Sequence, residues 1–340
     1  MSLETIEKIF SELFSSGWAA DDLYLIWHAG EPLVLPIDYY DQAFECIARL
    51  TPKHIAVSHA IQTNGMLIDD AWCRFFSARG VALGVSIDGP QDLHDANRVT
   101  RSGKPTFAET IAGIRCLRRN QVDFSVISVL TDAALGRARD LYDFYRSEGI
   151  VSVCFNVEEI EGQNTKSSLS GEGKRQAFEN FLREFWNFNV DTNALIYIRE
   201  FKDMIQKIVR PKEDDRIDNT LTESFEHLNV DWRGNFSTFS PEFLGQRSDE
   251  YGDFVLGNFW RTGLAESLES DTFKRLNGDV AAGVALCRTT CAYFPVCGGG
   301  SPVNKFYENG TLISAETLYC RMSVKAVADV AMEVIERTAS

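Results

Sequence analysis

The sequence contains no long uninterrupted run of apolar residues and no excess of positive charge. Its 340 residues include 34 lysines and arginines against 49 aspartates and glutamates, which gives a formal net charge of -15. A membrane-spanning helix needs about 18 consecutive apolar residues, and nucleic-acid binding depends on a basic surface. We therefore expect neither a membrane nor a nucleic acid among the partners of this protein.

The first residues also lack the features of a secretory signal. The start, MSLETIEKIFSELF, is amphipathic and carries acids, but it has neither a basic segment nor an apolar core. A cytoplasmic location is therefore the expectation. In a reducing compartment, clustered cysteines indicate metal binding before they indicate disulfides.

Up to about residue 157, the spacing of apolar residues alternates between helical and extended repeats. Helices are expected at residues 2–14, 38–50, 69–80, 107–120 and 138–149, and strands at 23–28, 55–63, 81–87, 122–130 and 151–157. Such alternation predicts an α/β fold with a parallel sheet of right-handed βα units, either a barrel or part of one. Because the chain opens on a helix, we expect a barrel that is entered one strand late.

The pattern changes near Gly162, where a polar, Gly/Ser-rich stretch indicates a linker. Beyond it we expect helices at 175–188 and 194–209, a hairpin at 227–239 turning at residues 233–235, and a final helix from about 323 to 336. Three segments follow from this pattern: a partial barrel over 1–162, a linker with helices over 163–228, and a cysteine-containing domain over 229–340.

Polar residues follow the expected strands, at the edge of a parallel sheet where ligands bind. The segments are WHAGEP (27–32), QTNG (62–65), SIDGP (86–90) with HDANR (94–98), and FNVEE (155–159). Turn chemistry alone explains any one of them. Together they place a carboxylate, amides, a hydroxyl and an arginine on one face, which suits a zwitterionic ligand that carries a nucleoside.

Four of the eight cysteines gather near the carboxyl end. Cys287, Cys291 and Cys297 have C-x3-C-x5-C spacing, expected on a short loop, and Cys320 follows. Four thiolates suit a [4Fe–4S] cluster or a structural zinc ion, and the residues alone do not separate the two. The glycines at 298–300 either offer N–H groups to cluster sulfurs or form a plain turn. The other cysteines, namely Cys46, Cys73, Cys116 and Cys154, are expected to be buried small hydrophobes.

The segments WHAGEPL, QTNG, SIDGPQDLHDANR and the cysteine segment resemble the radical S-adenosylmethionine (SAM) enzymes with a SPASM-type C-terminal domain. DWRGNFSTFSPE and CGGGSPVNKFYENG point most closely to the cyclophane-forming maturases of glycine-rich-repeat peptides. The resemblance covers nearly the whole chain. It implies a partial (βα) barrel of radical SAM type that lacks its first strand. It also implies side-chain crosslinking in a ribosomally synthesised glycine-rich precursor peptide, with ferredoxin or flavodoxin as electron donor.

The resemblance also implies a site for S-adenosylmethionine (AdoMet). The implied cofactor-binding residues are Gly30, Glu31, Pro32, Gln62, Asn64, Ser86, Asp88 and Arg98. Glu31 would hold the methionine ammonium and Arg98 would act near the ligand carboxylate, although a surface ion pair of Arg98 with Asp95 is nearly as favoured. Ala29 stands where the family usually has glycine. Since alanine disfavours positive φ, we expect a turn that tolerates a Cβ.

For the cysteine cluster the resemblance favours iron–sulfur over zinc. It implies one auxiliary [4Fe–4S] cluster at Cys287, Cys291, Cys297 and Cys320. A second auxiliary cluster is not expected, because Ser301 replaces one of its cysteines and the expected hairpin contains none.

The initiating [4Fe–4S] cluster of the family is bound by C-x3-C-x2-C, and no such triplet occurs in these 340 residues. A start downstream of the family's N-terminus explains both this absence and the late entry into the barrel. Either the gene model begins too late or the gene has lost its front.

Three interpretations remain open at this point. The first is a peptide maturase whose initiating step these residues do not supply, and no catalytic acid or base is assigned. The second is a catalytically inactive, truncated relative that binds a precursor peptide or a partner maturase. The third is a metal-independent βα-barrel enzyme with a zinc-stabilised appendix.

Overall fold

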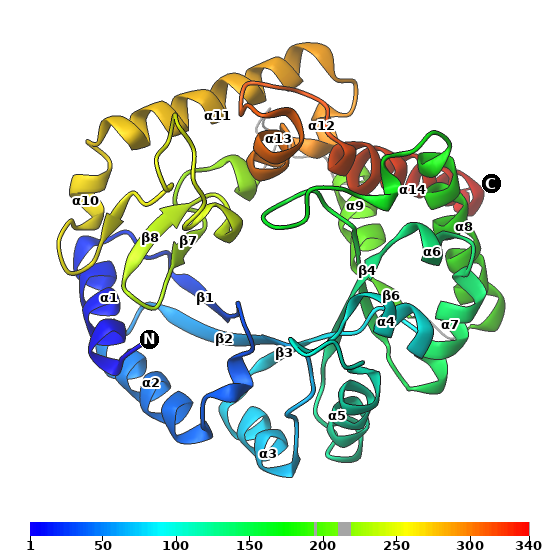
Figure 1. Cartoon of the computed structure of the whole chain (residues 1–340), viewed down its shortest axis with the longest axis horizontal. Helices are drawn as coiled ribbons and strands as arrows, with labels where there is room; N and C mark the ends of the chain where they lie inside the picture. The colour runs from blue at the N-terminus through cyan, green and yellow to red at the C-terminus, as the bar shows by residue number, and fades with distance from the viewer. Residues whose placement is uncertain (194–195, 210–218, 340) are drawn as a thin grey trace.

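The computed structural model describes residues 1–193, 196–209 and 219–339, and a curved parallel sheet lies at its centre (Figure 1). Its strands are β1 (Asp22–Trp27), β2 (Ala56–Thr63), β3 (Ala82–Ser86), β4 (Ser125–Leu130), β5 (Ser152–Val157) and β6 (Tyr197–Ile198). They pair in chain order, so β1 and β6 are the two edges. The expected partial βα barrel is confirmed.

Helices cover the outer side of this arc of strands (Figure 1). They are α1 (Leu3–Ser16), α2 (Ile37–Leu50), α3 (Asp70–Arg79), α5 (Phe107–Arg119), α7 (Ala138–Ser147) and α8 (Lys174–Thr192), with the shorter α4 (Gln91–Asn97), α6 (Asp132–Leu135), η1 (Pro32–Val34) and η2 (Ser168–Ser170) between them. The ends of α3 show why they form. The Asp69 carboxylate accepts from the first free N–H groups of α3, and Gly80 closes the helix in a left-handed conformation.

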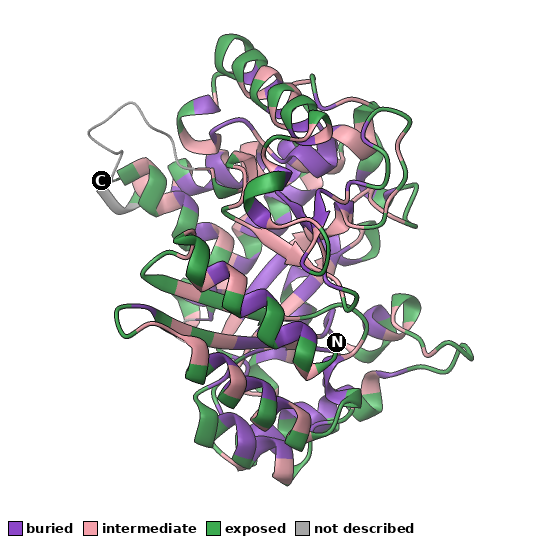
Figure 2. Cartoon of the chain, turned by 90° about the vertical axis from the view of Figure 1, so that its left-hand side faces the viewer, coloured by how far each residue is buried: buried purple, intermediate pink, exposed green. Residues whose placement is uncertain are grey.

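Strand alternation separates the two faces of the sheet. On β3, Leu83 and Val85 are buried against the helices, whereas Gly84 and Ser86 face the other way and are half-buried. The polar side chains at the carboxyl ends of the strands thus share the inner side of the arc. One hydrophobic core runs from α1 through the sheet to the last helix, and Figure 2 shows exposed residues mainly on the outer sides of the helices.

The remaining chain closes the open side of the arc (Figure 1). Its elements are α9 (Arg199–Val209), η3 (Thr220–Thr222), β7 (Leu228–Val230), β8 (Asn235–Thr238), η4 (Pro241–Phe243), β9 (Gly257–Asn258), α10 (Leu264–Ser267), α11 (Asp271–Thr290), α12 (Phe294–Cys297), α13 (Pro302–Asn309), the π-helical η5 (Cys320–Ala326) and α14 (Val327–Ala339). The expected hairpin is confirmed, since β7 and β8 pair antiparallel around a turn at Gly234.

Two sequence expectations differ from the structure. Cys287, Cys291 and Cys297 do not lie on a short loop: Cys287 is in the last turn of α11, Cys291 ends that helix and Cys297 ends α12. The helix expected over 194–209 begins only at Arg199, after β6, and residues 194–195 lie outside the described part of the chain. A strand of two residues is too short for its periodicity to be recognised. β6 also carries the parallel sheet beyond residue 162.

Among the helices in the described ranges, none has both the length and the apolar character needed to cross a bilayer.

Candidate functional site

Glu31 organises the turn after β1. Its Oε1 accepts hydrogen bonds from Leu33 N at 3.0 Å and from Thr63 Oγ1 at 2.6 Å, and its Oε2 accepts from Asn64 N at 2.8 Å. The carboxylate therefore ties the end of β1 to the end of β2. A carboxylate has about four lone-pair positions, so these three bonds leave Glu31 capacity for one more donor.

The turn before Glu31 holds two consecutive left-handed residues. Ala29 has φ 69° and Gly30 has φ 63°. A Cβ on Gly30 meets no atom within 4 Å, so the backbone conformation rather than crowding requires glycine there. Ala29 adopts the positive φ that alanine disfavours, and its exposed position gives the Cβ room.

Gln62 and Ser86 meet on the inner side of the sheet. Gln62 Nε2 donates to Ser86 Oγ at 3.1 Å, which joins β2 to β3. The neighbouring Asn64 uses its side chain locally, because its Oδ1 accepts from Met66 N at 2.9 Å. Pro32 begins η1 and its carbonyl accepts from the hydroxyl of Tyr40. Of the expected cofactor-binding side chains, Gln62 and Ser86 contact each other directly.

Asp88 and Arg98 form a bidentate ion pair. The Arg98 Nε–Asp88 Oδ2 and Nη2–Oδ1 distances are 2.7 and 2.9 Å, and Asp88 also accepts from Val129 N. The Asp88 side chain is only 5% exposed. The alternative pairing of Arg98 with Asp95 is wrong, because Asp95 instead accepts from the backbone N–H groups of Thr106 and Phe107 at the start of α5. The Asp88–Arg98 pair thereby braces the end of β3 against β4.

Polar residues at the ends of β5 and β6 extend the inner face. Asn156 Oδ1 accepts from Arg199 Nη2 at 3.3 Å and from the Cys154 thiol at 3.2 Å. Glu200 accepts from Cys154 Sγ and from Phe155 N. Asn156 belongs to the polar segment FNVEE, which the sequence pattern identified. Arg199 follows the two-residue strand β6, which is too short to be predicted, so the sequence did not point to Arg199.

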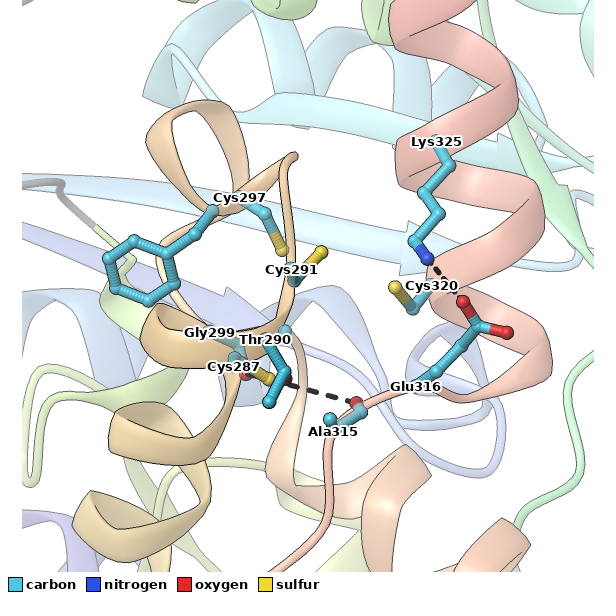
Figure 3. Close-up of a pocket in the computed structure, with 11 residues that line it drawn as sticks. Cys287, Thr290, Cys291, Cys297, Gly299, Ala315, Glu316, Cys320 and Lys325 are labelled. Carbon is cyan, nitrogen blue, oxygen red and sulfur yellow. Dashed lines mark hydrogen bonds and ion pairs between the residues drawn. The ribbon is translucent and has the colours of Figure 1, made fainter.

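The four carboxyl-terminal cysteines lie around one cavity of about 80 Å³. The thiols of Cys291, Cys297 and Cys320 point into a common space between the α11–α12 segment and η5 (Figure 3). Cys287 Sγ lies 3.6 Å from the carbonyl of Gly299 and 3.7 Å from that of Ala315. The cavity therefore has thiols from three separate helical elements, and Cys320 reaches it from a later part of the chain.

Three consecutive glycines shape one wall of this cavity. Gly298, Gly299 and Gly300 all have positive φ, at 70°, 113° and 77°; Gly298 N donates to the carbonyl of Phe294 and closes α12, which leaves the N–H groups of Gly299 and Gly300 to face the thiols. Burial raises the pKa of the Cys297 thiol, and hydrogen bonds from the backbone of Gly299 and Gly300 partly offset that increase. The glycine segment thus donates toward sulfur, as a cluster-binding wall does.

Burial also raises the pKa of Cys320 to about 12, with the nearby Cys297 adding to the increase and Lys325 opposing it. A protonated thiol is a poor ligand, and a bound metal centre deprotonates it. The lining side chains Lys325 and Glu316 form an ion pair beside Cys320 (Figure 3). A metal centre that binds here must therefore displace the thiol proton of Cys320.

The shape of the cavity bears on which centre fits. A zinc ion needs four sulfurs converging at about 2.3 Å from one point. Within the described residues, no group of three or more His, Cys, Asp or Glu side chains is placed to hold a metal ion. A polynuclear iron–sulfur cluster, which the sequence resemblance implies, takes its four thiolates from around a larger space.

The positions of a second cluster carry other residues. Ser301 begins α13 and its hydroxyl accepts from Asn304 N, and the hairpin ends in the buried Phe239. Of the scattered cysteines, Cys73 and Cys116 lie on outer helices with their sulfurs 3.7 Å apart, and Cys154 lies on β5. No C-x3-C-x2-C triplet exists in the sequence, so these residues do not fit an initiating cluster.

Comparisons with known proteins agree with this architecture. Residues 1–145 match the Radical SAM superfamily. The chain is 38% identical to the uncharacterized protein sll1766 of Synechocystis sp., over 99% of this chain and 85% of that protein. It is 27% identical to a serine-type anaerobic sulfatase-maturating enzyme of Bacteroides thetaiotaomicron, over 90% of this chain and 75% of that enzyme.

Solved structures share the fold. Native anSMEcpe with bound AdoMet gives a TM-score of 0.77 at 20% identity, covering 100% of this chain and 90% of that one. SuiB of Streptococcus suis, bound to its precursor peptide SuiA, gives 0.60 at 13% identity, covering 94% and 69%. The fold is thus a radical SAM partial barrel with a C-terminal domain like that of anSMEcpe. The chain belongs to the radical SAM/SPASM maturase family, and it is related to the anaerobic sulfatase-maturating enzymes.

Proposed function

We propose that this chain provides the AdoMet-binding barrel and the auxiliary-cluster domain of a radical SAM peptide maturase. Its substrate is a ribosomally synthesised, glycine-rich precursor peptide whose side chains become crosslinked. The observation that carries the proposal is the cavity with four thiols, Cys287, Cys291, Cys297 and Cys320, beside a barrel with a polar inner face. Related structures contain AdoMet or a peptide, and the hairpin sequence DWRGNFSTFSPE supports the glycine-rich substrate class.

The inner face of the barrel suits AdoMet. Glu31 keeps one acceptor position for the methionine ammonium, while Gln62 and Ser86 offer hydrogen-bonding groups from the adjacent strands. Arg98 is held in place at this end of the sheet by its bidentate pair with Asp88. Bound AdoMet supplies the hydrogen-abstracting chemistry of the family. These residues bind and orient it.

The thiol cavity would hold one auxiliary [4Fe–4S] cluster. Four thiols supply its ligands, and the N–H groups of Gly299 and Gly300 face sulfur and stabilise negative charge there. The cluster supplies electron transfer, with ferredoxin or flavodoxin as the proposed external donor. Because none of these 340 residues fit the initiating cluster, they do not by themselves supply the cleavage of AdoMet.

Anaerobic reconstitution with iron and sulfide tests the assignment. We expect about four irons per chain, in keeping with one [4Fe–4S] cluster. Replacing Cys297 or Cys320 with serine should remove most of the iron. Cys46→Ser is the matched control, since Cys46 lies on α2 away from the cavity. Zinc in place of iron at the wild-type site would contradict the proposal.

The missing C-x3-C-x2-C triplet favours a second candidate, a catalytically inactive relative that binds a precursor peptide or a partner maturase. With AdoMet and a reductant, this 340-residue chain should form no 5′-deoxyadenosine under either proposal. The mass and N-terminal sequence of the native protein separate them. A longer product that contains the triplet supports the enzyme, and a native start at Met1 supports the binding protein.

A further inference from the structure

Lys305 is a buried lysine without an acidic partner. It lies on α13 and is only 3% exposed. Its Nζ donates to the carbonyl of Gly283 at 2.9 Å. Across the described residues, the carbonyl of Gly283 is the hydrogen-bond partner of this ammonium, and no carboxylate pairs with it. A buried ammonium that has only one carbonyl acceptor is strongly unfavourable unless a negative charge lies near it.

The position of Lys305 places its charge next to the thiol cavity. Gly283 precedes Cys287 by one helical turn on α11, so its carbonyl is the regular helical acceptor for the Cys287 N–H. On its other side, the Lys305 side chain packs against Gly300, which lines the cavity. A Cβ built on Gly300 would lie 3.8 Å from Lys305 Cε. A Cβ on Gly283 would come within 3.1 Å of Lys305 Nζ. The two glycines thus leave the space through which this side chain reaches the cysteine segment.

We propose that Lys305 is the buried countercharge of the metal cluster that the four cysteines hold. The inference rests on the proposed function, which assigns an iron–sulfur cluster to this cavity. Four thiolates outweigh the positive charge of the iron–sulfur core, so the liganded cluster is an anion and becomes more negative on reduction. A fixed ammonium nearby stabilises the reduced state over the oxidised state and raises the reduction potential.

The second lysine near the cavity differs from Lys305 in its place and in its partners. Lys325 lines the cavity with its side chain 15% exposed, and its ammonium is already paired with the carboxylate of Glu316. Glu316 pairs with both Lys325 and the exposed Arg321, so a neighbouring carboxylate offsets the charge of Lys325, whereas none offsets that of Lys305. Lys305 supplies a whole unpaired charge, which makes the two lysines a matched comparison.

The test replaces Lys305 with methionine, which keeps the unbranched shape and most of the length of the side chain and removes the charge. In the reconstituted protein, EPR-monitored redox titration should give a reduced-to-oxidised ratio about tenfold lower than wild type at any fixed potential, a shift of about 59 mV for one electron. The double variant Lys325→Met, Glu316→Gln removes one charge of each sign and should give a clearly smaller shift. An unchanged potential in Lys305→Met would overturn the inference.

The stability of the cluster-free protein separates this role from plain packing. Removing an uncompensated charge should leave the melting temperature of apo Lys305→Met equal to or above that of wild type, while the increase on cluster loading becomes smaller. If Lys305→Met lowers the melting temperature equally in the cluster-free and the cluster-loaded protein, then Lys305 has a purely structural role and the inference is overturned. Lys305→Gln serves if the methionine variant fails to fold.

Iron content tests the proposed function, whereas the potential of an iron-loaded protein tests Lys305, so the two failures are distinguishable. A wild-type protein that takes up no iron overturns both. A wild-type protein with about four irons and a variant of unchanged potential overturns only the role of Lys305.

Discussion

The carboxamide oxygen of Gln62 fills the space beside Gly84 where a side chain would otherwise lie, 1.9 Å from the position that a Cβ would take. The two residues are register partners on β2 and β3. With no side chain at position 84, the Gln62 carboxamide reaches across to Ser86, 3.1 Å away. A missing side chain therefore positions a polar group on the inner face of the barrel.

Gly84→Ala should displace Gln62 and weaken AdoMet binding. The conflicting atom is the end of a flexible side chain, so Gln62 can rotate away and the free energy of unfolding should change by less than about 1 kcal/mol. Loss of one positioned hydrogen-bonding group should lower the affinity for AdoMet about tenfold, or about 1.4 kcal/mol. Calorimetric titration with AdoMet measures this change.

Gly136→Ala is the matched control, because a Cβ there meets no atom within 4 Å and φ is -89°. It should leave the AdoMet affinity unchanged. Equal affinities for Gly84→Ala and wild type would show that Gln62 does not contact the cofactor.

Arg98→Met should destabilise the protein even without AdoMet. It removes the bidentate partner of Asp88 and leaves a carboxylate of 5% exposure with a backbone donor at Val129. Breaking a buried ion pair in this way costs about 3 kcal/mol. Urea denaturation of the cofactor-free protein measures the loss.

The exposed Arg101 offers a comparison on the same segment. Arg101→Met should change the free energy of unfolding by no more than about 0.5 kcal/mol. If Arg98→Met has a similarly small effect, then Arg98 acts on a ligand rather than as a brace.

Much of the barrel could be predicted because its elements repeat a strong pattern. The strand from Ala82 to Ser86 alternates buried and half-buried residues, and the helix from Asp70 to Arg79 has both a capping aspartate and a terminal glycine. β6 was missed since two residues carry no period. The helix that holds Cys287 contains small residues and glycines within its sequence, which weaken the apolar period and hide the helix.

The site was only partly accessible to sequence reasoning. The sequence spacing predicted one ligand set made of Cys287, Cys291, Cys297 and Cys320. The structure places these four cysteines around one cavity. The pairing of Asp88 with Arg98 depends on where β3 and α4 meet in space. The burial of Lys305 had no signal at all, because lysine is almost always exposed and nothing in the sequence marks an exception.

Glu159 and Glu161, just after β5, should make stability fall as the pH rises from mildly acidic to mildly alkaline. Burial raises the pKa of Glu159 to about 7 and that of Glu161 to about 8, with nearby carboxylates adding to both increases. An unfolded glutamate has its ordinary pKa of about 4.3. The folded state therefore holds more protons between these values, and its stability declines as the pH rises from about 5 to above 8.

Glu161→Gln should remove part of that decline. The variant should match wild type near pH 4.5 and exceed it by about 1–3 kcal/mol at pH 8.5. Unfolding free energies measured from pH 5 to 9 check the difference in slope. Glu172→Gln, at an exposed position, should keep the wild-type slope, and a parallel curve for Glu161→Gln would contradict the role of burial.

Ala29→Gly should stabilise the protein. Ala29 is exposed and has φ 69°, a conformation that costs a residue with a Cβ about 1–2 kcal/mol. Glycine removes that cost but adds about 0.5–1 kcal/mol of unfolded-state entropy, so a net gain of about 0.5–1 kcal/mol is expected. Thermal and denaturant unfolding of the variant measure this gain.

Two control variants show whether a gain in stability of Ala29→Gly comes from relief of backbone strain or from glycine substitution in general. At the exposed Ala48 in the interior of α2, alanine is already in its preferred conformation, so Ala48→Gly should cost about 1 kcal/mol. Gly30→Ala should also destabilise, because Gly30 has φ 63°. If Ala29→Gly instead destabilised as Ala48→Gly does, the turn that leads to Glu31 would not be left-handed in solution, and the anchoring of Glu31 between β1 and β2 would need another geometry.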